Sequence, residues 1–377
     1  AKKAHDDFGY FQQRYFGRIA TPWQVEAAEQ IVSYLETPDK EFVVINCPPG
    51  AGKTTTFSHD IPAWLTVRNR AIRGMLGHSV AREVKKNLGR LKRTFESTIP
   101  FTADPEDIEK GIAVNAKSTL ALDFGRFKPT NKDVWNQESL LVMQYEDVGS
   151  TAEKEYTWQA YGIDAGFIGT RVDFVIWDDL VDPSKLRTAE AKEKLEEFYD
   201  DVCETRLEPG GLLVLMGQRI SSDDLYRYNL EKTLPIDDED ELLETMSEAE
   251  IDELRHRKKY HHIKFKAHYP EKCSEGSHKR TAPYYPDGCL LDPRRLSWRD
   301  LSGRIANGAE KFEIFYQQED VQTSSFVREE WIYGNGGHPG CIDRNRDFWQ
   351  FPAHLNPQSC IVVATADPSP TNFWAVE

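Results

Sequence analysis

The chain has 377 residues and a formal net charge of -15, with 39% hydrophobic and 29% charged residues. This composition is typical of a soluble globular protein and excludes a collagen-like or intrinsically disordered chain. No apolar run approaches the roughly 20 residues of a membrane-spanning helix, and the first residues lack the apolar core of a secretion signal. At about 150 residues per domain, the length allows two or three domains.

Apolar runs and helical spacing alternate through the first two thirds of the chain. In chain order we predict a helix over 25–35, a strand over 42–46, a helix over 54–67, a strand over 74–77, a basic helix capped by Ser79, and strands over 174–177 and 212–216. Unbroken apolar runs of this length are typical of strands buried on both faces of a parallel sheet. We therefore expect an α/β fold that binds its ligands at the carboxyl ends of the strands.

The charge is unevenly distributed. Residues 68–93 contain nine basic side chains and one acidic side chain, Glu83, whereas residues 237–253 contain ten acidic side chains and no basic one. The acidic run separates the alternating region from a more irregular part rich in Pro and Gly, so we place a domain boundary near residue 235.

The six cysteines do not have the dense spacing of a disulfide framework, so we expect a reducing compartment. Cys273, His278 and Cys289 are the nearest approach to a metal pattern. They lack the C-x2-C pair of a zinc ribbon, and we interpret them as loop residues.

The segment after the first strand matches a phosphate-binding loop. Residues 47–55 read CPPGAGKTT, which fits G-x4-G-K-[ST] except at Cys47, where the pattern has glycine. The glycines let backbone N–H groups approach phosphates, Lys53 reaches the terminal phosphates and the Thr54 hydroxyl binds Mg²⁺. A simple tight turn would explain neither the lysine nor the threonine. We predict an ATP site with Mg²⁺ that includes Pro49, Gly50, Ala51, Gly52, Lys53, Thr54 and Thr55.

An acidic pair follows the strand predicted over 174–177, so its carboxylates should emerge at the same edge as the phosphate-binding loop. Phosphoryl transfer to water needs a carboxylate that holds the metal and a group that orients the water. We assign Asp178 to Mg²⁺ and Asp179 to the water. Most motors with this mechanism have Glu at the second position, and a helix N-cap is the alternative for either aspartate.

Two further polar pairs are candidates for nucleotide contacts. The Gln24 amide matches the donor and acceptor on the edge of adenine, and Trp23 could stack on the base; a helix N-cap region with an exposed glutamine is the alternative. Gln218 follows the strand over 212–216 and could sense the γ-phosphate. Arg219 beside it could stabilise charge or be a surface arginine.

These motifs together resemble the large terminase subunits of tailed double-stranded DNA bacteriophages. The most specific part is GFIGTRVDFVIWDDLV at 166–181, which continues through 206–211 and 217–225. The PWQ triplet at 22–24 and the deviant phosphate-binding loop are similar to the same family. Many terminases have threonine at the position of Gln218. The resemblance covers most of the chain from about Thr21 onward.

The C-terminal part resembles the same family. Residues 312–318 are similar to the segment that links motor and nuclease, and residues 361–369 look like the first strand of the RNase H-like nuclease, with Asp367 as its first metal-binding aspartate. Two-metal hydrolysis needs several carboxylates, so we expect most of the nuclease to be missing here. The resemblance implies a P-loop NTPase motor domain of RecA/ASCE type at 1–235, an acidic segment and linker subdomain at 236–355, and the truncated start of the nuclease at 356–377.

The resemblance implies an ATP-hydrolysing motor in the host cytoplasm. Such a motor packs double-stranded DNA into a procapsid through a portal protein, as a homo-oligomeric ring served by a small terminase subunit. The transition state of ATP hydrolysis needs an arginine, for which Arg171 is our first candidate and Arg219 the second. The basic helix suits sequence-independent contacts to DNA phosphates, with a solvated helix face as the alternative. The predicted DNA contacts are Arg82, Lys85, Lys86 and Arg90.

Two other functions remain open. A superfamily 2 helicase shares the glutamine, the phosphate-binding loop and the acidic pair, but it needs a second sheet domain, which the residues after 217 do not indicate. A nucleotide-regulated assembly protein would bind ATP without useful turnover and would not need Asp179.

Overall fold

The computed structural model describes residues 1–37, 41–129, 135–144, 156–163, 171–181, 188–234, 246–269 and 289–320, and four short strands after residue 333. The chain divides into two compact units, Ala1–Asp320 and Val321–Glu377. None of the helices in the described ranges has the length and hydropathy of a membrane span.

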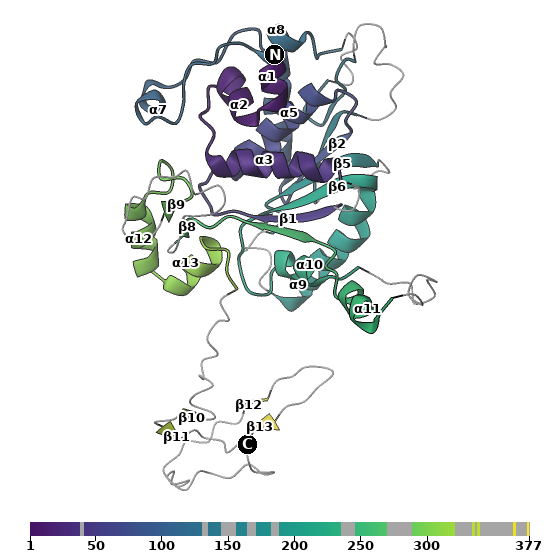
Figure 1. Cartoon of the computed structure of the whole chain (residues 1–377), viewed down its shortest axis with the longest axis vertical. Helices are drawn as coiled ribbons and strands as arrows, with labels where there is room; N and C mark the ends of the chain where they lie inside the picture. The colour runs from purple at the N-terminus through teal and green to yellow at the C-terminus, as the bar shows by residue number, and fades with distance from the viewer. Residues whose placement is uncertain are drawn as a thin grey trace. The chain divides into compact units, whose positions relative to one another are not determined.

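A seven-stranded sheet forms the centre of the first unit (Figure 1). Its strands are β1 (Phe42–Asn46), β2 (Gly74–His78), β3 (Ser139–Leu140), β4 (Trp158–Gly162), β5 (Val172–Asp178), β6 (Leu207–Gly217) and β7 (His261–Lys264). They lie in the order β3-β4-β2-β5-β6-β1-β7, and every neighbouring pair is parallel except β3–β4. This mostly parallel sheet, with β6 between the strand before the phosphate-binding loop and the strand before the acidic pair, confirms the expected P-loop NTPase fold class.

Helices cover both faces of the sheet. The N-terminal ones are α1 (Lys2–Asp6), α2 (Phe8–Phe16), α3 (Pro22–Leu35), α4 (Lys53–Thr55), the π-helix η1 (Thr56–Asp60), α5 (Ile61–Arg68), α6 (Ala81–Glu96), α7 (Pro105–Glu109) and α8 (Leu120–Phe124). Later in the chain are α9 (Ala189–Phe198), the π-helix η3 (Tyr199–Cys203), the 3-10 helix η4 (Glu204–Arg206), α10 (Leu225–Glu231), α11 (Glu248–Arg255), α12 (Trp298–Ala306) and α13 (Ala309–Phe315).

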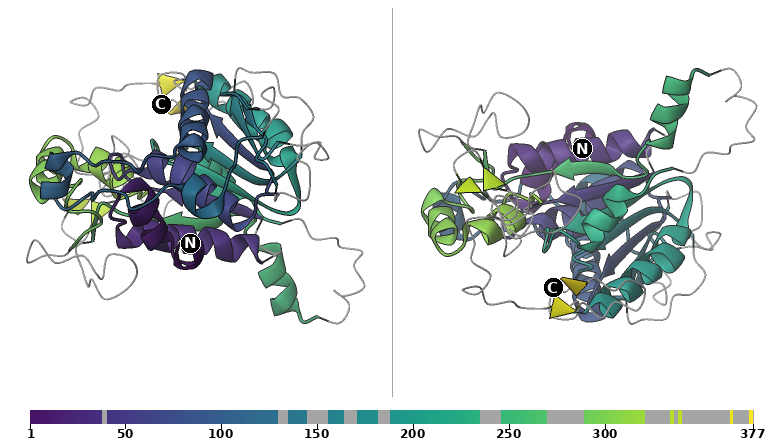
Figure 2. Two further views of the ribbon diagram at one scale, coloured as in Figure 1. Left: turned by 90° about the horizontal axis from the view of Figure 1, so that it is seen from above. Right: turned by 90° about the horizontal axis from the view of Figure 1, so that it is seen from below.

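The alternation of side chains along each strand creates two separate cores. Val43 and Ile176 pack into the cluster that contains α3, α5 and α6, whereas Val44, Val175 and Leu213 pack into the cluster that contains α10 and η3. Successive residues of a strand point to opposite faces, so an unbroken apolar strand fills both layers. The result is a three-layer α/β/α arrangement, in which α3 and α10 lie on opposite faces of the sheet (Figures 1 and 2).

Two strands differ from the sequence prediction. β6 begins at Leu207, well before the predicted residue 212, because Leu207 pairs with Val172 across a β-bulge. β7 comes from the segment assigned to the linker subdomain, yet it is the edge strand beside β1, with His261 opposite Val43. Residue 235 is therefore not a boundary of the folded unit, which continues to Asp320.

The remaining strands form small antiparallel pairs. β8 (His268–Tyr269) pairs with β9 (Cys289–Leu290), and the apolar residues after β9 join the core of the large sheet. In the second unit, β10 (Gly334–Asn335) pairs with β11 (His338–Pro339), and β12 (Thr365–Ala366) pairs with β13 (Ala375–Val376). Asp367, proposed for the nuclease, lies outside the described residues, as do Cys273 and His278 of the possible metal pattern.

Candidate nucleotide site

The phosphate-binding loop joins β1 to α4 and contains two glycines in the left-handed region. Gly50 has φ 82° and Gly52 has φ 91°, conformations that residues with a Cβ rarely adopt. Cys47, which replaces the first glycine of the pattern, is fully buried, and its N–H donates to the Gly217 carbonyl at 3.0 Å. Burial raises the pKa of the Cys47 thiol. Its side chain therefore belongs to the core and not to the phosphate-facing surface of the loop.

The helix after the loop contains a π-helical segment. The run from α4 to α5 is interrupted by η1, whose Ser58 hydroxyl donates to Asp178 Oδ2 at 2.7 Å. Single π turns inside helices are frequent at functional sites. Ser58 thus connects the phosphate-binding helix to the end of β5, a contact that the sequence pattern did not indicate.

Asp178 is suited to hold a cation. Asp178 is 2% exposed, and its Oδ1 is buried without a hydrogen-bond partner among the described residues. Burial, with a further contribution from Asp179, raises the pKa of the Asp178 carboxyl. An unpaired buried acceptor is costly, so a bound cation would stabilise it. The half-buried Thr54 hydroxyl also lacks a hydrogen bond to any described residue, so both oxygens are free to bind Mg²⁺.

Other ligands for Mg²⁺ would come from water and the nucleotide. In the described ranges, no three His, Cys, Asp or Glu side chains come close enough together to hold a metal ion. Mg²⁺ commonly keeps several waters and binds one or two protein groups together with substrate phosphates. The residues present therefore fit a magnesium ion that arrives with a nucleotide.

Asp179 lies beside Lys53 in a strained backbone conformation. Its φ is 47°, and its carboxylate forms an ion pair with Lys53, which is 8% exposed. Two contacts hold the backbone: the Asp179 N–H donates to Met216 O at 3.0 Å, and the Ser79 hydroxyl donates to Asp179 O at 2.8 Å. Strain that is held by its surroundings in this way often occurs at functional sites. Ser79 makes this contact instead of capping α6, whose N-cap is Val80.

Gln218 is brought to the same edge of the sheet. It follows Gly217, which pairs with Asn46 at the end of β1, while Asp178 pairs with Met216. The half-buried Gln218 side chain makes no hydrogen bond with a described residue. The structure thus brings together the side chains predicted to bind phosphate, metal and water with the predicted sensor.

The predicted adenine contacts do not fit this structure. Trp23 is fully buried, with its ring centroid 5.2 Å from that of Phe265, so no face is left for a base. Gln24 uses both ends of its amide: Oε1 accepts from Thr21 N at 2.9 Å, and Nε2 donates to Thr56 Oγ1 at 2.8 Å. Gln24 thus joins the start of α3 to η1 through its amide, and Trp23 packs against Phe57 and Phe265 in the core.

Neither arginine candidate can act in its own site. Arg219 is 2% exposed, and its guanidinium binds Asp224 at 2.9 Å and Asp320 at 2.5 Å. Arg171 is exposed but precedes β5, so the length of the strand separates it from Asp178. Seven strand residues span roughly 20 Å, which is too far for one side chain to reach.

The basic helix α6 divides into exposed and internal positions. Arg82 and Lys86 are exposed. Lys86 forms an ion pair with Glu83 at 3.3 Å on the same helix, and the half-buried Lys85 forms one with Glu138 at 2.6 Å. Arg90 is half-buried and donates to Thr55 Oγ1 at 3.4 Å, and burial lowers the pKa of its guanidinium. Arg90 therefore lies against the phosphate-binding helix and not on an outer face of α6.

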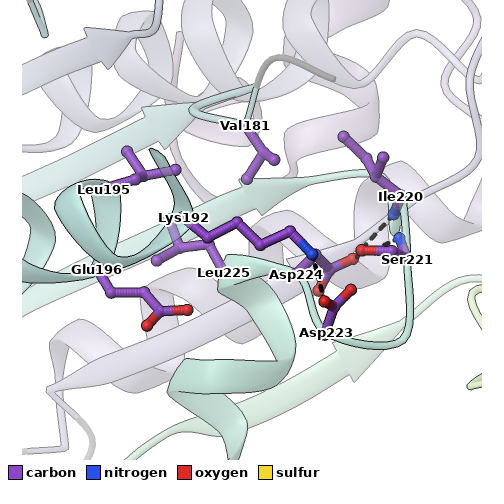
Figure 3. Close-up of a pocket in the computed structure, with 9 residues that line it drawn as sticks. All are labelled: Val181, Lys192, Leu195, Glu196, Ile220, Ser221, Asp223, Asp224 and Leu225. Atoms are coloured by element: carbon purple, nitrogen blue, oxygen red, sulfur yellow. Dashed lines mark hydrogen bonds and ion pairs between the residues drawn. The ribbon is translucent and has the colours of Figure 1, made fainter. Parts of the chain in front are cut away.

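A small cavity lies where the chain leaves β5 and β6 (Figure 3). It has a volume of about 160 Å³ and lies between Val181, Leu195 and the segment from Ile220 to Leu225, with the ion pair of Lys192 and Asp223 at its edge. Pockets for small molecules usually measure about 300–1,000 Å³, so this cavity is too small for a nucleotide.

One arginine near the phosphate-binding loop was absent from the sequence prediction. A Cβ added to Gly52 would lie 3.9 Å from both Cζ and Nη1 of Arg295. Arg295 belongs to an irregular segment 243 residues further along the chain, and no local pattern marks it as a nucleotide contact.

Among the comparisons with known proteins, the search of solved structures gives matches. No family model and no curated protein matches the chain. Among solved structures, the chain is similar to an arginine-to-alanine mutant of the large terminase ATPase domain of Thermus phage P74-26. The identity is 12%, the match covers 76% of this chain and 90% of that chain, and the TM-score is 0.35. At this level of similarity, the function has to be argued from the site.

Proposed function

We propose that this chain is an ATP-hydrolysing motor of viral DNA packaging. It would act as a terminase large subunit, which couples ATP hydrolysis to translocation of double-stranded DNA into a procapsid. The observation that supports this proposal best is the convergence of Lys53, Asp178 and Asp179 at one edge of a parallel sheet, behind a loop with two left-handed glycines. A structural turn would require neither the buried lysine nor the unpaired buried carboxylate oxygen.

The ion pair of Lys53 and Asp179 supports a two-state role for this site. Bound phosphates would attract Lys53 away from Asp179, because a triphosphate carries more negative charge than one carboxylate. Asp179 would then accept a hydrogen bond from the attacking water and orient it. Thr54 and Asp178 would hold Mg²⁺, which neutralises charge on the phosphates.

The exit of β6 offers a connection from the phosphates to the end of the unit. Gln218 would contact the γ-phosphate, and Arg219 beside it is tied to Gln318, whose Oε1 accepts from Arg219 N at 2.8 Å. Arg219 also binds Asp320, the last residue of the unit. Loss of the γ-phosphate would release Gln218. A shift of Gln218 would then reach residues 318–320, because Arg219 is hydrogen-bonded to Gln318 and ion-paired with Asp320.

The DNA contact is assigned to the exposed side of α6. The Ser79 hydroxyl, two residues before this helix, donates to the backbone oxygen of Asp179, so α6 begins next to the hydrolytic site. Arg82 and Lys86 would contact DNA phosphates without reading the sequence. Arg90 and Lys85 are less suited to this role, because both side chains are half-buried against other parts of the fold, whereas Lys86 is exposed and pairs only with Glu83 on its own helix.

Assembly would complete the site. Arg171 cannot reach its own nucleotide, so we assign it to the site of a neighbouring subunit in a homo-oligomeric ring. A portal protein, a procapsid and a small terminase subunit are the remaining partners expected from the resemblance, and the host cytoplasm is the expected location.

A superfamily 2 helicase is the second candidate. It would need another large parallel sheet, whereas the other sheets in the described residues are two-stranded and antiparallel. This observation favours the packaging motor. Strand displacement on a forked duplex, compared with translocation on an intact duplex, distinguishes the two enzymes.

The test of hydrolysis compares Lys53→Ala and Asp179→Asn with the parent protein. We expect both variants to lose phosphate release, while only Lys53→Ala loses ATP affinity. Full turnover in Asp179→Asn would refute the catalytic role of this carboxylate, and ATP binding without turnover in the parent protein would favour a nucleotide-regulated assembly protein. Unchanged ATP binding by Lys53→Ala would refute the nucleotide site itself.

A further inference from the structure

Arg295 is an arginine next to the phosphate-binding loop that has no assigned role. Its guanidinium lies 3.9 Å from the position that a Cβ on Gly52 would occupy, and Leu296 is 3.5 Å from the corresponding position on Gly50. Consecutive residues of one segment therefore pack against both left-handed glycines. The segment lies between β9 and α12, far from the loop in sequence.

The backbone of this segment is well anchored. Leu291 N–H donates to Ala267 O at 3.0 Å, and Asp292 O accepts from Arg295 N at 3.1 Å and from Leu296 N at 2.8 Å. Leu291 and Leu296 are buried in the core of the large sheet. These hydrogen bonds and the buried leucines fix the backbone of Arg295 beside the phosphate-binding loop.

The two adjacent arginines have different environments. Arg294 donates to the backbone oxygens of Gly111 at 3.0 Å and Ile19 at 3.3 Å, so it joins distant parts of the fold. The Arg295 side chain is 43% exposed, and its contact with Asp292, between Nε and Oδ2, is long at 3.6 Å. This long contact leaves the terminal nitrogens of Arg295 available.

We propose that Arg295 binds the phosphates of ATP in the site of its own subunit, an inference that rests on the proposed function. A guanidinium offers several N–H donors in a planar fork that matches two phosphate oxygens. Asp292 is 1% exposed, and its Oδ2 lies 3.6 Å from Nε of Arg295, so the carboxylate is beside the guanidinium while the terminal nitrogens remain available for phosphate oxygens. The contact would also tie the segment before α12 to the nucleotide.

The test measures binding of ATP, ADP and AMP to the full chain by calorimetry, in parent protein and variants. Arg295→Ala should weaken ATP binding roughly tenfold to a hundredfold, the range expected for charge-assisted hydrogen bonds, and AMP binding much less. Arg295→Lys should restore part of the ATP affinity, because a point charge replaces the fork. Arg299→Ala on α12 is the matched control, since Arg299 is exposed and should leave all three affinities unchanged.

The outcomes separate this inference from the proposed function. If Arg295→Ala binds ATP like the parent while Lys53→Ala does not, Arg295 has no phosphate contact and the nucleotide site stands. An equal loss for ATP, ADP and AMP overturns a contact to the β- and γ-phosphates, because AMP lacks both. If Lys53→Ala binds ATP normally, the proposed function fails. Circular dichroism checks folding, and Arg295→Gln replaces the alanine variant if that variant does not fold.

Discussion

Lys53 and Asp179 form an ion pair that joins the start of α4 to the end of β5, across 126 residues of sequence. The proposed reaction needs both side chains, yet in this structure their charged groups are paired with each other. The pair keeps the buried lysine neutralised, since an isolated buried charge is costly. ATP binding must therefore compete with Asp179 for Lys53.

This competition predicts opposite effects of Asp179→Asn on binding and on turnover. Removal of the carboxylate frees Lys53 and removes a negative charge near the triphosphate, so ATP affinity should rise severalfold. Turnover should fall by about 10²–10⁴, the usual contribution of a group that handles the water proton. Asn tolerates the positive φ of position 179, so the backbone should be kept. Nucleotide titration and phosphate release measure the two effects; weaker ATP binding by this variant would contradict the competition.

Protonation of a buried histidine predicts acid sensitivity. Burial lowers the pKa of His59 to about 4, although Asp60 opposes this shift, while the usual pKa is about 6.5. The unfolded chain therefore binds a proton before the folded chain does. Stability should fall between about pH 6.5 and pH 4, by up to about 1.4 kcal/mol per pH unit. Denaturant unfolding of His59→Gln should have a shallower pH dependence in this window than the parent, and His256→Gln, on an exposed residue, is the control.

Arg219 is predicted to be a structural residue. Its removal leaves Asp224, which is 4% exposed, without its buried partner, and Asp320 loses one of its two arginines. Breaking a buried ion pair by removing one partner costs about 3–5 kcal/mol. We expect Arg219→Ala to lower the free energy of unfolding by that amount in urea titrations, whereas Arg171→Ala should change it little. An unfolding midpoint equal to that of the parent would make Arg219 dispensable for the fold.

Arg171 is predicted to act between subunits, which a mixing experiment can detect. Lys53→Ala subunits have an inactive nucleotide site but a normal Arg171, and Arg171→Ala subunits have the reverse. Under conditions in which the ring forms, each variant alone should be nearly inactive, and a mixture should regain part of the ATPase rate. Arginines of this kind contribute about 10³–10⁵ in rate. A mixture no more active than its components would refute the role in trans.

The surface of α6 is predicted to contact DNA through Arg82 and Lys86. Charge reversal of both should weaken binding to duplex DNA of any sequence. It should also lower the slope of log affinity against log salt by about 2, since each phosphate contact contributes about 0.9. Lys194→Glu on α9 is the control, because Lys194 is 70% exposed and lies on another helix. An unchanged slope would move the DNA contact away from this helix.

Local sequence patterns are enough to predict the class of fold and the centre of the site. The apolar strands, the glycine loop and the acidic pair are local patterns, and parallel strands bring their carboxyl ends to one edge whatever the loops between them do. Lys53, Asp178, Asp179 and Gln218 could therefore be placed together before their contacts were known.

The partners of the charged and aromatic side chains could be identified only in the folded chain. Trp23 is in the core, Arg219 is bound by two aspartates, Arg90 faces the phosphate-binding helix, and Arg295 lies next to a loop 243 residues away in sequence. A side chain's role depends on its burial and on the charges around it. Both are set by segments that are distant in the chain, so no local pattern contains this information.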